Sequence, residues 1–143
     1  MKSRYEGIQN KLWDIREGCF FLSLLSVAEE YRLEHGMMKV DLIDAVNMAF
    51  EQKYITFDYF VRFDCEILSK LTGQPVTKRK AKNCGALKEN EYSVAKYEKK
   101  TVNKDGKEVT VNHFRRRYFD VYANSATVRE GKLVEYYIYT IGV

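Results

Sequence analysis

Apolar residues recur at helical spacing in the first half of the chain. Residues 19–31 are apolar almost all round, which is typical of a central, buried helix. Two further helices are expected over residues 40–53 and 58–71, where apolar side chains return every three or four positions. The first half of the chain is therefore predicted to be mainly helical.

Gly73 and Pro75 mark a change in this pattern. Glycine suits the left-handed position that ends a helix, and proline cannot continue one. Beyond them, runs rich in Val, Thr and Tyr predict strands over residues 92–99, 107–118, part of 120–129 and 133–141, with a hairpin turn at Asn103-Lys104-Asp105-Gly106. Helices followed by an antiparallel sheet predict an α+β fold.

Length and composition predict one domain over residues 1–143, mainly helical over 1–74 and mainly stranded over 75–143. No apolar run approaches the roughly 20 residues that span a bilayer, and no signal-peptide pattern follows Met1. Three cysteines without a framework spacing fit a reducing compartment, so we expect a cytoplasmic protein with no membrane partner. The net charge of +4 permits an acidic partner and does not require nucleic acid.

Cys19 is the first candidate for chemistry, because it follows Gly18 at the start of the first predicted helix. The unpaired backbone N–H groups of a helix N-terminus stabilise a thiolate, which lowers the thiol pKa and makes the sulfur a better nucleophile. The alternative is a structural role, since a free cysteine at the head of an apolar helix is commonly a small buried hydrophobe.

A nucleophilic cysteine needs a base, and the chain has two histidines. His35 lies at a polar helix end and is expected to be solvated, whereas His113 lies within a predicted strand and is the candidate base. His113 could equally be a polar residue on the solvated face of a hairpin. Asp120 is the nearest downstream carboxylate that could orient an imidazole, and Gln9 is the only glutamine upstream of Cys19 that could stabilise an oxyanion.

The chain resembles the papain-like cysteine peptidases, and among them the bacteriocin-processing (double-glycine) peptidase-like proteins and small phage-encoded relatives. The resemblance is carried, in order, by Gly18-Cys19-Phe20, Ser23-Leu24-Leu25, His113-Phe114, Asp120 and residues 125–132. The resemblance implies a papain-like fold and a peptidase or amidase active on a protein or peptide. It assigns Cys19 as nucleophile, His113 as base, Asp120 as orienting group and Gln9 to the oxyanion hole. Separately, the sequence has no Gly-rich phosphate loop and no zinc-ligand spacing, so we expect no cofactor and no metal site. The resemblance implies a protein of bacterial or phage type and places it in a bacterial or phage-infected cell.

Arg115, Arg116 and Arg117 support a second hypothesis. In a strand, Arg115 and Arg117 share the face of His113, while Phe114 and Arg116 point the other way. Guanidinium groups beside a cleft would attract carboxylates or phosphates. The alternative function is therefore a catalytically inactive papain-like scaffold that binds a protein or nucleoprotein, such as a phage inhibitor of host defence. A solvated charged face remains the simpler interpretation, and the sequence leaves the oligomeric state open.

Overall fold

The computed structural model describes residues 18–56, 60–116 and 131–142 of the chain. These residues confirm the predicted α+β class, with helices followed by an antiparallel sheet. The helices are α2 (Gly18–Glu34), α3 (Leu42–Glu51) and α4 (Asp64–Thr72), and the strands are β1 (Val76–Ala81), β2 (Glu91–Val102), β3 (Glu108–Arg115) and β4 (Lys132–Ile141).

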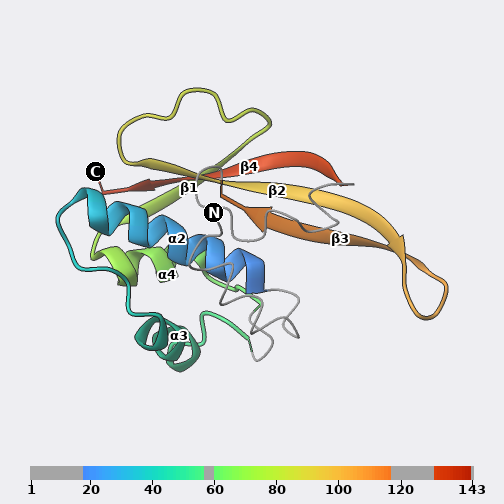
Figure 1. Ribbon diagram of the computed structural model, residues 1–143, viewed down its shortest axis with the longest axis horizontal. Helices are drawn as coiled ribbons and strands as arrows, with labels where there is room; N and C mark the ends of the chain where they lie inside the picture. The colour runs from blue at the N-terminus through green and yellow to red at the C-terminus, as the bar shows by residue number, and fades with distance from the viewer. Residues whose placement is uncertain (1–17, 57–59, 117–130, 143) are drawn as a thin grey trace.

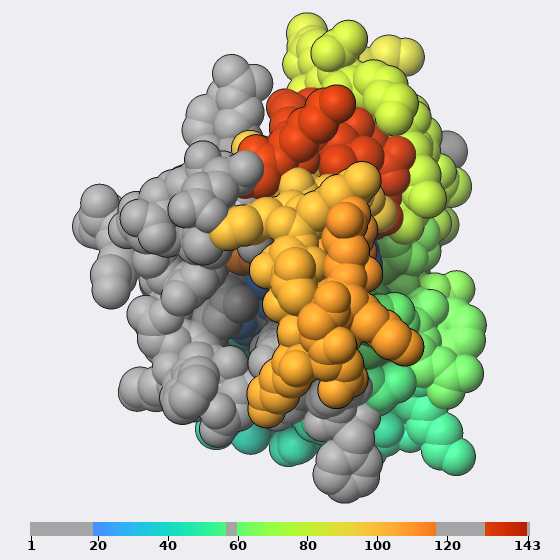
Figure 2. Space-filling model, turned by 90° about the vertical axis from the view of Figure 1, so that its right-hand side faces the viewer, coloured from blue at the N-terminus to red at the C-terminus, as the bar shows by residue number. Residues whose placement is uncertain are grey.

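The four strands form one sheet in the order β1-β4-β2-β3, with every neighbouring pair antiparallel. The helices lie on one face of this sheet, and the connection between β1 and β2 arches above the other face (Figure 1). The β2–β3 hairpin extends past the helices (Figure 1) and crosses the middle of the face shown in Figure 2. Strand β3 therefore meets the helical layer only near its C-terminal end.

Helix α2 is the centre of the core, as its nearly continuous apolar sequence predicts. Its side chains pack against α4 and against the helix-facing side of the sheet. The buried members of α2 are Cys19, Phe21, Leu22, Leu24, Leu25, Val27, Ala28 and Tyr31. From the sheet, the core receives Tyr92 and Val94 of β2 together with Tyr137, Tyr139 and Ile141 of β4.

Two predicted elements differ from the structure. Helix α4 begins at Asp64 rather than near residue 58, because Ile55 and Val61 form an isolated antiparallel bridge just before it. Strand β1 was missed because its sequence, Val76–Ala81, contains three cationic residues and no alternating apolar pattern. β1 lies at an edge of the sheet, where charged side chains are common.

The predicted chain reversals are confirmed. Gly73 ends α4 in the left-handed conformation with φ of 72°, and Gly106 has φ of 76° in the β2–β3 turn. The Asn103 side chain accepts hydrogen bonds from the backbone N–H groups of Asp105 and Lys107, which fixes that turn. Among the described residues, no helix is long and apolar enough to cross a membrane.

Candidate functional site

Cys19 is the second residue of α2, so the predicted position in the first turn of a helix is confirmed. Its side chain is 2% exposed and belongs to the core cluster. Its carbonyl oxygen accepts a hydrogen bond from the Ser23 hydroxyl at 2.8 Å. The sulfur therefore sits where a helix N-terminus favours a thiolate, yet it is almost fully enclosed.

The two histidines lie at very different distances from this helix end. His35 follows the C-terminus of α2, about 24 Å from Cys19 at the helical rise of 1.5 Å per residue, and its ring stacks on Tyr31 with centroids 4.0 Å apart. His113 is 5% exposed and lies on β3, opposite Tyr97 of β2. His113 is thus the histidine whose strand reaches the Cys19 end of α2.

Direct contact between α2 and β3 is made by the residues next to Cys19 and His113. The rings of Phe20 and Phe114 stack with centroids 4.3 Å apart, and both rings approach Tyr137 of β4. Side chains alternate along a strand, so the Phe114 contact with α2 directs His113 toward the opposite face of the sheet. The structure brings the two segments together while aiming the imidazole away from α2.

Arg116 does not belong to a basic surface. Arg116 is 4% exposed and faces α2, where its guanidinium pairs with Glu30 and donates to the Ser26 hydroxyl at 3.4 Å. Its Nε also donates to the Ser93 carbonyl oxygen of β2 at 2.9 Å. Arg116 therefore joins the end of β3 to both α2 and β2, which is a structural role rather than a surface one.

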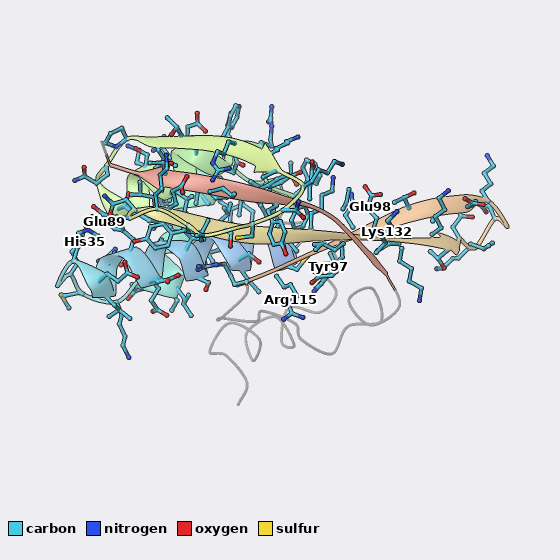
Figure 3. The ribbon with its side chains drawn as sticks, turned by 90° about the horizontal axis from the view of Figure 1, so that it is seen from above. His35, Glu89, Tyr97, Glu98, Arg115 and Lys132 are labelled. Carbon is cyan, nitrogen blue, oxygen red and sulfur yellow. The ribbon has the colours of Figure 1, made fainter. Side chains whose placement is uncertain are left out.

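Arg115 lies on the other face of β3, shared with His113. It is half-buried and stands diagonally across the β2–β3 pair from Tyr97, close to it in Figure 3. The predicted alternation of Arg115 and Arg116 is consistent with these contacts. Arg117, Asp120 and Gln9 lie outside the described residues, so their predicted roles as basic surface, orienting group and oxyanion donor remain predictions.

A second polar cluster, which the sequence did not single out, lies between α4 and the sheet. The Asp64 carboxylate accepts hydrogen bonds from the Lys78 ammonium and the Tyr139 hydroxyl, both at 2.7 Å. Burial alone would raise the pKa of Asp64, but these two hydrogen bonds outweigh burial and hold the pKa below 3.8. The available sequence signal was the alternation of Lys78 and Lys80, which places both ammonium groups on the helix-facing side of β1.

The pKa of the neighbouring Cys65 thiol is shifted in the opposite direction. Burial, and next the charge of Asp64, raise the pKa of Cys65 to about 11. A thiol with such a pKa is almost entirely protonated at neutral pH and is a poor nucleophile. Cys65 is therefore a suitable unreactive reference for Cys19.

We expect Asp64→Asn to lower the free energy of unfolding at pH 7 by about 1.5–3 kcal/mol, the range for hydrogen bonds to a charged group. The pKa of Asp64 is lowered in the folded state, so its stabilisation is present above the unfolded pKa of about 3.9 and is lost as the pH falls through the folded pKa. Urea unfolding of both proteins between pH 7 and pH 3 measures this. Asp105→Asn, in the exposed hairpin turn, is the control. A pH-independent difference between wild type and Asp64→Asn would contradict the assignment.

Comparison with known proteins found no relative of the chain: no family model, no curated protein and no solved structure matches it. Within residues 18–56, 60–116 and 131–142, no group of three or more His, Cys, Asp or Glu side chains is placed to hold a metal ion.

Proposed function

We propose that the chain is a papain-like cysteine peptidase or amidase in which Cys19 is the nucleophile and His113 the base. The observation that supports this most is the Phe20–Phe114 stack, because it joins the first turn of α2 to the strand that carries the only histidine near it. A cysteine in the first turn of a central helix, packed on an antiparallel sheet, is the framework that such chemistry needs.

In the proposed reaction, the Cys19 sulfur gives its proton to His113 and attacks the carbonyl carbon of an amide. The C–N bond breaks as the imidazolium returns the proton to the leaving amine, and a thioester remains on Cys19. Water then hydrolyses this thioester, releasing the acid and restoring the thiol. In this proposal Asp120 orients the imidazole and Gln9 donates to the oxyanion.

Turnover requires the imidazole on the face of β3 that α2 covers. A change of one residue in the pairing of β3 with β2 would exchange the two faces of β3. β3 is at the edge of the described sheet, so such a change breaks pairing with one strand. In the described register Phe114 occupies that face, and a shift would separate Phe114 from Phe20 and Arg116 from Glu30, so this requirement counts against turnover.

A second candidate function is a papain-like scaffold that binds a protein or nucleoprotein without turnover. The 2% exposure of Cys19 and the direction of His113 favour it, because the sulfur is enclosed and the imidazole lies on the face of β3 opposite to α2. Under this proposal the cationic side chains at the helix-facing side of the sheet carry the function, and substitution of Cys19 leaves binding unchanged.

Thiol labelling distinguishes the two candidates. We expect iodoacetamide to modify Cys19 with an apparent pKa well below the roughly 8.5 of a free thiol, and His113→Ala to abolish that shift. Labelling is followed residue by residue against pH in the full chain, and Cys65 is the slow reference because its pKa is raised to about 11. Labelling of Cys19 as slow as that of Cys65 would exclude the hydrolase and favour the binding scaffold.

A further inference from the structure

A cavity of about 280 Å³ lies between the first turn of α2, residues 60–64 and the helix-facing side of the sheet. It begins where Phe20 and Phe114 stack, so it adjoins the candidate catalytic segments without including Cys19 or His113. Its size is just below the range of about 300–1,000 Å³ that is usual for small-molecule sites. A compact ligand is therefore the expected occupant.

The charged groups of this cavity do not balance. Three cationic side chains, Arg62, Lys78 and Lys96, face one carboxylate, Asp64. Asp64 is already engaged by Lys78 and by the Tyr139 hydroxyl. Lys96 reaches Glu98 only at 3.9 Å, and within the described residues no ion pair joins Arg62 to a carboxylate. Arg62 is thus left for a ligand, together with Lys96, whose contact with Glu98 is long.

Two of the cavity's cations, Lys78 and Lys96, lie around one aromatic ring together with the neighbouring Lys80. The Lys78 ammonium lies 4.0 Å from the centroid of Tyr137, and the ammonium groups of Lys80 and Lys96 lie at 5.2 and 6.0 Å from the same centroid. Cations within about 6 Å of an aromatic face are attracted to it. Three ammonium groups around one ring also repel one another, and a bound anion would relieve that repulsion.

The remaining walls of the cavity suit a flat ring. Phe20, Phe114 and Tyr137 form a cluster with centroid separations of 4.3–5.7 Å, and Phe60 at the cavity is 53% exposed. Aromatic side chains stack on planar ligands, and Asn112 adds an amide that can both donate and accept hydrogen bonds.

From this juxtaposition we infer that the cavity binds a phosphate monoester carried on an aromatic or heteroaromatic ring, of about the size of a nucleoside monophosphate. A phosphate monoester carries about −1.5 to −2 charges at pH 7, which suits the Arg62 guanidinium and the Lys96 ammonium with its long contact to Glu98. Arg62 offers the planar fork that phosphate oxygens prefer, and the ring would lie on the aromatic walls. This inference is independent of the hydrolase proposal, because none of its contacts involves Cys19 or His113.

Calorimetric titration of the full chain with adenosine monophosphate and with phenyl phosphate tests the inference. We expect at least one of them to bind ten or more times more tightly than either adenosine or inorganic phosphate, and to weaken as salt is raised. Tighter binding of adenosine monophosphate identifies a nucleotide site, and tighter binding of phenyl phosphate identifies an aryl phosphate site. The proposal is overturned if inorganic phosphate binds as tightly as the esters, or if neither ester binds at a concentration on the order of 10 mM.

Two charge-removing variants locate the site. Arg62→Met and Lys96→Met are each expected to weaken binding about tenfold or more, with folding of each variant checked by circular dichroism. Arg62 is exposed, so its variant folds even if Lys96→Met does not. Lys104→Met, in the distant β2–β3 turn, removes the same charge and should leave affinity unchanged. An equal loss in Lys104→Met would show general charge attraction and overturn the site.

Discussion

Arg116→Ala is expected to lower the free energy of unfolding by about 3–5 kcal/mol, the usual cost of removing one partner of a buried ion pair. The guanidinium is 4% exposed and holds Glu30 of α2, so its loss leaves an uncompensated carboxylate in the interface. It also leaves the Ser93 carbonyl oxygen without the hydrogen bond that Arg116 donates. Urea unfolding at pH 7 measures the change.

The matched control is Lys100→Ala. Lys100 also pairs with a glutamate, Glu108, at 3.7 Å, but both side chains are exposed, at 77% and 69%. Exposed pairs contribute about 0–1 kcal/mol, so this variant should change stability little. The double variant Arg116→Met with Glu30→Leu should recover much of the loss, because no isolated charge remains. Equal effects of Arg116→Ala and Lys100→Ala would refute the structural role of Arg116.

Phe114→Ala is expected to destabilise the fold by a comparable amount, about 3–5 kcal/mol, the range for truncating a buried phenylalanine. Phe114 is 7% exposed and contacts both Phe20 and Tyr137, so its removal leaves a void where β3 meets α2. Thermal and urea unfolding measure the loss. Val111→Ala, on the same strand but 41% exposed, is the control and should cost far less.

A double-mutant cycle isolates the stack itself. Phe20→Ala and Phe114→Ala should show a coupling energy of about 0.5–1.5 kcal/mol, as aromatic pairs do beyond their buried area. Additive effects of the two substitutions would show that the rings do not act as a pair. In that case the Phe20–Phe114 contact would no longer support the proposed function.

The sequence predicted the helical half well because its signals are local. The apolar run of α2, the glycine after α4 and the Asn103–Gly106 turn each depend on neighbouring residues, and all three are confirmed. Strand β1 escaped prediction because it is stabilised by pairing with β4, a partner far away in the chain. Its cationic residues give no local strand signal, although Lys78 lies over the rings of Tyr137 and Tyr139.

The candidate site was predictable only in part. The structure brings the segments that carry Cys19 and His113 together, since Phe20 and Phe114 stack, but the pairing of Cys19 with His113 stays a prediction. The residue order gave no signal for more than this. It could not say which face of β3 would turn toward the helix, because His113-Phe114 presents one aromatic side chain to each face. That choice depends on the register with β2 and on the Arg116–Glu30 pair, neither of which has a local signal.

The place of β4 in the sheet has a consequence for synthesis of the protein. β4 follows every other described strand in the chain, yet it lies between β1 and β2 and pairs with both. While the ribosome is still translating residues 132–141, β1 has no partner and one side of β2 is open. These two strand edges are therefore open to pairing with other chains until β4 emerges, and the described sheet closes only after residues 132–141 have been made.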